Sequence, residues 1–414
     1  MTSLQPVRGT RDLLPDDSRR FHHIADSARA VAQRYGYEEI STPIFEFTEV
    51  FKRTLGDTSD IVTKEMYTFE DKGGDEITLR PEGTAGVARA LISGGLSQNL
   101  PLKYFYYGPM FRYERPQKGR MRQFHQIGAE LLGVPEPMGD VEIIALGAAI
   151  LSDLGVYSDT TLELNTLGNT ESRAAYRKVL VEYFQDHRES LSKDSLDRLE
   201  RNPLRILDSK NSGDREVVAG APDFGDSIDA ESSDFFAVVE SGLRALEIAY
   251  MRNSRLVRGL DYYCHTAFEF TTESLGAQGA VLAGGRYDGL VGLMGGPRTA
   301  GVGWAAGVER LAMLISDPPS PPRPIAVIPV GEEAQIQALV ISIDLRRQGF
   351  TVELGYRGNL KRRLARANKL NARIAIIIGA DEQAQQAATL RDFDTGEQEL
   401  VKLVELKDRL GRYA

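Results

Sequence analysis

One short segment of this chain, residues 111–130, carries five cationic side chains and reads FRYERPQKGRMRQFHQIGAE. Cations at the tip of such a segment can bind phosphate groups. The segment ends in Gln126 and Glu130, which are separated by an even number of residues and therefore project from one face of a strand. We favour a phosphate-binding tip beside a pocket over a surface hairpin with solvated arginines. The five cations are Arg112, Arg115, Lys118, Arg120 and Arg122.

The same segment is expected to fold as a β-hairpin. Residues 104–110 form an aromatic and apolar run that suits a buried strand. Pro116 and Gly119 then mark a turn, and the alternating pattern that begins at Gln123 predicts a returning strand. The hairpin would bring the cations of its tip close to the polar side chains of its second strand.

Four further segments resemble signatures of one known family and occur in that family's order. They are LRPEGTAG at residues 79–86, LVRGLDYY at 256–263, GGRYDGL at 284–290 and GVERL at 307–311. With the hairpin, they make the chain similar to the histidyl-tRNA synthetases, which belong to the class II aminoacyl-tRNA synthetases. The resemblance covers essentially the whole chain and begins with PVRGTRDLLP at residues 6–15.

Composition and length agree with a cytoplasmic enzyme of two or more domains. The chain has 414 residues, of which 42% are hydrophobic, enough to bury a large core. Its single cysteine, Cys264, excludes an intrachain disulfide and a thiolate metal cluster. The N-terminus lacks a signal-peptide pattern, and the longest apolar stretch, residues 143–154, is too short to cross a bilayer. The five histidines show no metal-binding spacing, so we expect no structural metal.

A proline-rich segment separates two expected domains. Residues 316–324 hold five prolines and favour an extended connector. We therefore expect a linker at residues 319–324, between a catalytic domain at 1–318 and an anticodon-binding domain at 325–414. Residues 321–414 carry 15 Lys and Arg against 12 Asp and Glu, a net charge of +3, whereas the rest of the chain carries −12. A locally basic domain suits a protein that binds a polyanion at chosen points.

The C-terminal domain is predicted to be a small α/β domain with a mainly parallel sheet. Continuous apolar runs predict buried strands, and helical patterns lie between them. The expected strands are residues 325–330, 350–354 and 372–379, and the expected helices are residues 332–348 and 359–370.

The second of these helices, residues 359–370, has a basic face. Its spacing turns Leu360, Leu364, Ala367 and Leu370 toward the sheet and leaves Lys361, Arg362, Arg363, Arg366 and Lys369 outward. By the residues alone, RNA binding and a merely solvated face are equally good explanations, and the resemblance to the synthetases' anticodon-binding domain favours RNA. The expected tRNA contacts are Arg362, Arg363 and Arg366 on this helix and Gln117 and Arg122 in the hairpin.

The resemblance implies an α+β catalytic domain with an antiparallel sheet, and a homodimer. Residues 165–233 interrupt the class II core and are expected to form a helical insertion, which either contacts the tRNA acceptor arm or is only structural. The family's motif 1 would be the helix before Tyr35 together with the strand EEISTPIFE at residues 38–46, with Pro43 near the dimer interface.

Motif 3 of the family resembles GVGWAAG at residues 301–307 and the helix that follows. Its spacing, G-x-G-x-x-x-G, departs from a dinucleotide fingerprint, and the chain has no P-loop sequence. In the family these glycines let the nucleotide approach the backbone closely. Ala305 stands where many relatives have another glycine. The resemblance assigns Arg310 to the γ-phosphate of ATP.

The remaining ATP contacts are implied by motif 2 and by LVRGLDYY. Arg112 would bridge the α-phosphate and the substrate carboxylate, and Arg258 would act on the reacting carboxylate. Phe124 would stack on adenine, and Glu114 would contact its amino edge. Mg²⁺ is expected to accompany ATP, without assigned protein ligands. Because a carboxylate is already a nucleophile, the enzyme's task is positioning and cationic stabilisation.

The histidine pocket combines acceptors for an ammonium group with partners for an imidazole. Glu82, Thr84 and Gln126 match family positions that accept the α-ammonium. A carboxylate and a hydroxyl are the best partners for the two ring nitrogens, and Glu130 and Tyr263 match those roles. The expected histidine-binding residues are Glu82, Gly83, Thr84, Arg112, Gln126, Glu130, Arg258, Tyr262 and Tyr263.

These expectations describe a histidine–tRNA ligase that forms histidyl-adenylate from L-histidine and ATP and transfers histidine to tRNA(His). The alternative is a non-catalytic, histidine-binding regulatory paralogue of histidine biosynthesis. That paralogue lacks the C-terminal domain and key arginines, whereas this chain keeps both. A synthetase for threonine, proline or glycine does not fit LVRGLDYY and GGRYDGL.

Overall fold

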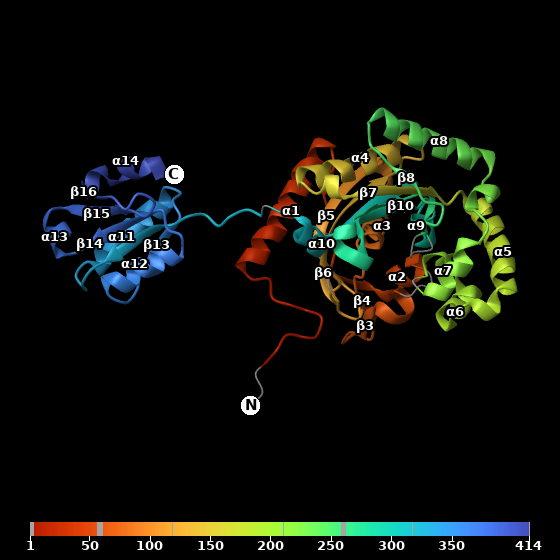
Figure 1. Cartoon of the computed structure of the whole chain (residues 1–414), viewed down its shortest axis with the longest axis horizontal. Helices are drawn as coiled ribbons and strands as arrows, with labels where there is room; N and C mark the ends of the chain where they lie inside the picture. Colours follow the sequence, from red (N-terminus) through yellow and green to blue (C-terminus); the bar gives the residue numbers. More distant parts are fainter. Residues whose placement is uncertain are drawn as a thin grey trace. The chain divides into compact units, whose positions relative to one another are not determined.

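The computed structural model describes residues 4–55, 61–117, 119–209, 211–257, 262–316 and 318–413. The chain divides into two compact units, Met1–Pro319 and Ser320–Ala414 (Figure 1). Each unit has its own sheets and its own hydrophobic core. Arg258 and Lys118 lie outside the described residues.

The larger unit is built on an eight-stranded sheet. Its strand order is β1-β5-β6-β11-β10-β9-β7-β8, and neighbouring strands are antiparallel except at the two edges, where β1 and β8 run parallel to their neighbours. The expected antiparallel catalytic sheet is therefore confirmed. The strands are β1 (Glu38–Glu39), β5 (Leu102–Phe111), β6 (Gln123–Leu132), β7 (Thr161–Thr166), β8 (Met251–Arg252), β9 (Cys264–Thr271), β10 (Ala280–Arg286) and β11 (Gly301–Gly307).

Helices cover both faces of this sheet (Figure 1). Side chains of α1 (Pro15–Arg34), α4 (Met138–Asp153), α8 (Ala230–Ala245) and α10 (Val308–Leu314) share one core with the sheet. The opposite core contains α2 (Thr48–Leu55), α3 (Thr84–Ser93) and α9 (Leu290–Leu293). Strand alternation divides β6 between the cores, because Ile127, Ala129 and Leu131 belong to the first and Leu132 to the second.

Residues 38–46 do not form the single strand expected for motif 1. The chain forms β1 and then β2 (Phe45–Phe47), which belongs to a separate sheet of order β2-β4-β3 with β3 (Tyr67–Glu70) and β4 (Glu76–Leu79). Pro43 lies between β1 and β2 and cannot donate a ladder hydrogen bond, which suits it to the break.

The insertion between β7 and α8 is helical, as expected. It consists of α5 (Thr170–Asp186), α6 (Lys193–Arg201) and α7 (Ser212–Ala219), with short 3₁₀ turns between them. The side chains of Asn169, Ser192 and Asn211 cap these helices. Aromatic and aliphatic residues of the insertion form a core of their own, which includes Tyr176 and Phe184. Asn165 and Thr166, the first residues of the expected insertion, instead belong to β7.

The smaller unit has the predicted parallel strands β12 (Ile325–Pro329), β13 (Val352–Leu354) and β14 (Ile374–Ile378). The predicted helices are α11 (Gln335–Arg347) and α12 (Leu360–Lys369), and two short helices, α13 (Ala380–Ala384) and α14 (Leu406–Leu410), follow. Sequence reasoning missed β15 (Ala387–Asp392) and β16 (Gln398–Lys402), which extend the sheet antiparallel in the order β13-β12-β14-β15-β16.

The predicted faces of α12 are partly wrong. Arg363 is only 8% exposed, and its guanidinium donates a hydrogen bond to the carbonyl of Pro329 at the end of β12. Leu360 and Leu370 are instead 37% and 39% exposed. An arginine stem is apolar and can lie along a core while its head reaches a carbonyl, which a hydrophobic count does not anticipate.

The apolar stretch at residues 143–154 lies mostly in α4. Within the described part of the chain, no helix is long and apolar enough to span a membrane.

Candidate active site

The predicted hairpin is present. β5 and β6 pair from Leu102 with Leu132 to Phe111 with Gln123. At the tip, Gln117 and Arg120 exchange backbone hydrogen bonds, and Gly119 supplies the left-handed conformation of the turn at φ +73°. The N-terminal segment supports the hairpin, because the Arg122 backbone N–H donates to the carbonyl of Gly9 at 2.7 Å.

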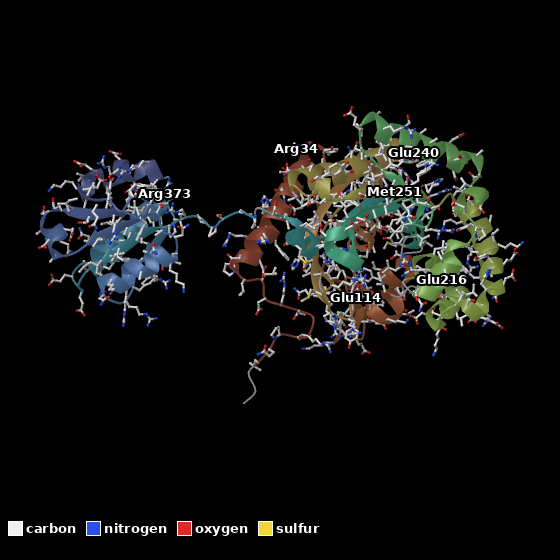
Figure 2. The ribbon with its side chains drawn as sticks, in the orientation of Figure 1. Arg34, Glu114, Glu216, Glu240, Met251 and Arg373 are labelled. Carbon is white, nitrogen blue, oxygen red and sulfur yellow. The ribbon has the colours of Figure 1, made fainter. Side chains whose placement is uncertain are left out.

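A cavity of about 260 Å³ lies between the hairpin, the start of α3, and strands β9, β10 and β11. Nine of the predicted site residues line it, although they come from segments far apart in the sequence. They are Glu82, Thr84, Arg112, Glu114, Phe124, Gln126, Tyr262, Tyr263 and Arg310. The hairpin carries Glu114, which is labelled in Figure 2.

One end of the cavity is cationic. Arg112 donates from Nε to the carbonyl of Pro81 at 2.9 Å, and its guanidinium lies 5.3 Å from the ring centroid of Phe124. Burial lowers the pKa of Arg310, and the nearby charges of Arg120 and Arg112 lower it further. Guanidinium groups stay protonated at neutral pH, so the three arginines form a concentrated positive site for an anion.

Carboxylates accompany these arginines. Glu114 lies 3.1 Å from Arg120 and 3.9 Å from Arg112, measured between the nearest nitrogen and oxygen atoms. Glu269 on β9 also lines the cavity and acts electrostatically on Arg310. Sequence reasoning missed Arg120 and Glu269 as site residues, although Arg120 belongs to the basic segment at residues 111–130.

The other end of the cavity is rich in acceptors. The carboxylate of Glu82 accepts the backbone N–H groups of Thr84 and Ala85 at 2.6 and 2.8 Å, where α3 begins. Burial raises the pKa of Glu82, and these two hydrogen bonds oppose the rise. Among the described residues, Gln126 presents a buried Oε1 without a hydrogen-bond partner. That oxygen is suited to accept a hydrogen bond from a bound ligand.

Glu130 lies beside this acceptor end but is not among the residues that line the cavity. It is fully buried, accepts a hydrogen bond from Thr84 Oγ1 at 2.6 Å, and also accepts one from the Tyr287 hydroxyl. Burial raises the pKa of Glu130 to about 8, against the opposing effect of these two hydrogen bonds. Sequence reasoning did not assign Tyr287, although it lies within GGRYDGL.

Two of the three glycines of motif 3, Gly301 and Gly303, pack against protein groups. A side chain on Gly303 would collide with the Glu130 carboxylate, and one on Gly301 would collide with the Tyr287 ring. These two glycines therefore make room for protein groups rather than for a nucleotide. The small motif 3 residues that line the cavity are Ala305 and Gly307.

Three other predicted residues have structural partners. A side chain on Gly83 would collide with the Tyr106 ring, so Gly83 serves close packing. The rings of Tyr262 and Tyr263 lie 4.6 Å apart between centroids and are nearly buried.

Of the two hairpin residues expected to contact tRNA, Gln117 is exposed. The Arg122 guanidinium instead lies 3.8 Å from the Tyr113 ring centroid, so Arg122 already has a partner within the hairpin.

Comparison with known proteins identifies the family. The family described as histidyl-tRNA synthetase matches residues 9–311, and the anticodon binding domain matches residues 324–412. The chain is 60% identical over its full length and the full length of the histidine–tRNA ligase of Rhodospirillum rubrum. It is 57% identical to the ligase of Gluconacetobacter diazotrophicus, over 96% of both chains.

A solved structure, apo histidyl-tRNA synthetase of S. aureus, superposes with a TM-score of 0.82 at 33% identity, over 98% of this chain and 99% of the other. Sequence and fold thus agree, and the chain belongs to the histidyl-tRNA synthetase family.

Proposed function

We propose that this chain is a histidine–tRNA ligase, which activates L-histidine with ATP, releases pyrophosphate and transfers histidine to the 3′ end of tRNA(His). The observation that carries the proposal is a single cavity with arginines at one end and buried acceptors at the other. A triphosphate fits the cationic end, and an amino acid fits the acceptor end. The two substrates would then meet near Arg112.

In the first step, a histidine carboxylate oxygen attacks the α-phosphorus of ATP. A new oxygen–phosphorus bond forms, the bond to the β-phosphate oxygen breaks, and pyrophosphate leaves with its electron pair. Arg112 would bridge the two reacting anions, Arg310 would hold the triphosphate tail, and Phe124 and Glu114 would hold adenine. Because these groups are positioned before reaction, they stabilise the developing charge without reorganising. Arg258, outside the described residues, is proposed for the same charge.

The amino acid would be held by Glu82, Thr84 and Gln126 at its ammonium group and by Tyr263 and Glu130 at its ring. Four donors, two N–H groups on Glu82 and two O–H groups on Glu130, leave these carboxylates with further acceptor capacity. In the second step, a hydroxyl of the terminal tRNA ribose attacks the adenylate carbonyl and forms an ester bond. The bond between the carbonyl carbon and the phosphate oxygen breaks, AMP leaves with the electron pair, and the hydroxyl proton passes to solvent.

Mg²⁺ is proposed to enter with ATP. Its preferred ligands are oxygens, and it is commonly held by phosphates with one or two carboxylates. Glu269 lines the cavity and acts electrostatically on Arg310, so it fits a metal at the phosphate end. Bound there, the ion would neutralise phosphate charge.

A homodimer and a cytoplasmic location are also proposed. Four apolar side chains near the three-stranded sheet, Ile44, Phe45, Phe47 and Phe69, are between 44% and 59% exposed. Exposed apolar patches commonly mark interfaces. Light scattering of the purified chain would measure its oligomeric state. Cell fractionation would show whether the protein is in the cytoplasm.

Pyrophosphate exchange tests the central proposal. We expect exchange of labelled pyrophosphate into ATP with histidine and with none of the other nineteen amino acids, because the wrong amino acid leaves buried acceptors unpaired at a cost of ~1–3 kcal/mol each. Exchange with threonine, proline or glycine would contradict the specificity. Binding of histidine without any exchange would favour the regulatory paralogue.

The exposed cations of α12 are proposed to contact tRNA. Arg363 is excluded from this set because its side chain is buried. Arg366 stays 65% exposed while paired with Glu353 at 2.8 Å, and Lys361 and Arg362 are also exposed. We expect the double variant Lys361→Ala, Arg362→Ala to raise the KM for tRNA(His) and to reduce the salt slope of binding by about 1–2, because fewer counterions are released.

A matched control for this variant is Arg409→Ala, Arg412→Ala. It removes the same charge from the same unit, where both arginines pair with Glu399. Equal effects of the two double variants would show that only the overall charge of the unit matters.

A further inference from the structure

The junction between β11 and α10 contains a hydrogen-bonded pair, His125 and Glu309, to which the proposed reaction assigns no role. β11 pairs with β6 as far as Gly307 opposite Gln126, and the chain then turns into α10. Beyond this point the His125 backbone N–H donates to Glu309, at 3.0 and 2.9 Å from its two carboxylate oxygens. The His125 ring adds a contact between Nδ1 and Oε1 at 3.2 Å. Glu309 therefore takes the place that a continued strand would have occupied.

The His125 ring packs against two aromatic rings, and Glu309 is nearly buried. The His125 ring lies between Phe21 of α1, at 5.3 Å edge-on, and Tyr107 of β5, at 6.0 Å and nearly parallel. Glu309 is 9% exposed. Hydrogen bonds to a buried carboxylate are strong, and a buried group that loses its partner pays for its desolvation.

The pair lies between Phe124 and Arg310, the groups proposed to bind the two ends of ATP. His125 stands in β6 between Phe124 and Gln126, whose side chains line the cavity. Glu309 directly precedes Arg310 in the first turn of α10. The N-cap residue of this helix, Gly307, has no side chain that could cap the first turn. The Glu309 carboxylate thus directly links the first turn of α10, which carries Arg310, to β6, which carries Phe124.

We propose that His125 and Glu309 are positioning residues that hold Arg310 in register with Phe124, so that the triphosphate and adenine sites keep a fixed separation. Glu309 lines the cavity beside Arg310 and His125 does not, but this role does not require either residue to touch substrate. The inference rests on the proposed function, because ATP is the ligand whose two ends are aligned. Loss of the pair should therefore weaken ATP use more than histidine use.

The test compares substitutions at both positions in ATP–pyrophosphate exchange by the full-length protein. His125→Phe keeps a ring between Phe21 and Tyr107 and removes the Nδ1 contact, whereas His125→Asn places an amide nitrogen near the position of Nδ1. Glu309→Ala removes the acceptor. We expect Glu309→Ala and His125→Phe to raise the ATP KM ~10-fold, with the histidine KM within about twofold of wild type. His125→Asn should recover most of the loss.

Glu240→Gln is the matched control. Glu240 is also a nearly buried carboxylate with an arginine partner, Arg252, but it lies on α8 and does not line the cavity. In Figure 2 it appears well separated from Glu114. This variant should leave both KM values unchanged, even if it lowers the melting temperature.

The outcomes separate the inference from the proposed function. Absence of histidine-dependent exchange in the wild type would overturn the proposed function. Two results would overturn the positioning role if the wild type shows normal exchange. One is an unchanged ATP KM in folded variants, and the other is an equal rise of the KM for ATP and the KM for histidine. If Glu309→Ala does not fold, Glu309→Gln keeps one acceptor oxygen, and a selective rise of about threefold is expected of it.

Discussion

Replacing Arg112 by alanine is expected to lower the rate of adenylate formation by ~10²-fold or more, about 2.7 kcal/mol of transition-state stabilisation. Arg112 stands at the cationic end of the cavity, where its guanidinium lies beside Phe124 and is oriented by the carbonyl of Pro81. Negative charge increases there as the carboxylate approaches the α-phosphate. Removing a preorganised cation should therefore cost more in the transition state than in the bound substrates.

Single-turnover kinetics would separate the rate of adenylate formation from the affinities for ATP and histidine. Arg112→Lys keeps the charge but loses the planar fork, so it should recover only part of the rate. Arg34→Ala is a suitable control, because Arg34, labelled in Figure 2, ends α1 and is 64% exposed in its pair with Asp153. Equal losses in binding and rate would show that Arg112 only holds the substrates. The same measurement on Arg258→Ala tests the residue that the structure does not describe.

Deleting residues 320–414 is expected to leave ATP–pyrophosphate exchange within about twofold of wild type while charging of tRNA(His) falls ~10²-fold or more. All the residues proposed for ATP and histidine belong to the larger unit, which has its own sheets and cores. Each stacked base is worth about 1–3 kcal/mol, so losing two or three anticodon contacts accounts for a fall of this size.

Aminoacylation of tRNA(His), measured beside exchange on the same preparation, checks this expectation. Circular dichroism and light scattering would establish that the truncated chain is folded and has the oligomeric state of the full-length protein. Loss of exchange in a folded, correctly assembled truncation would show that the smaller unit supports the catalytic site. Undiminished charging would show that tRNA is recognised by the larger unit.

Much of the fold was predictable because the decisive patterns are local. The hairpin follows from an apolar run, a turn with Pro116 and Gly119, and a second alternating strand, and β5 and β6 pair as expected. In the smaller unit, three apolar runs and two helical patterns correspond to β12, β13, β14, α11 and α12. The antiparallel strands β15 and β16 were missed, because residues 387–402 lack a continuous apolar run. Their partners are fixed only when the sheet forms.

The residue types of the site were also present in the sequence, and the family resemblance located nine of the residues that line the cavity. Sequence could not determine how these residues divide between the cavity wall and the layer behind it. Glu130 lies against Thr84 and Tyr287, three groups that are distant in the sequence. Their contact depends on β6, α3 and the end of β10 meeting in space.

The sequence by itself thus determined most of the elements and the order of the two units, because periodicity and turn residues act over a few neighbours. The family resemblance supplied the expected residues of the site. Only the tertiary structure decided that Arg363 is buried, that Gly301 and Gly303 make room for Tyr287 and Glu130, and that Glu309 reaches His125. Each of these outcomes depends on the space and hydrogen-bonding groups supplied by a different element, and close packing fixes them only after the elements have assembled.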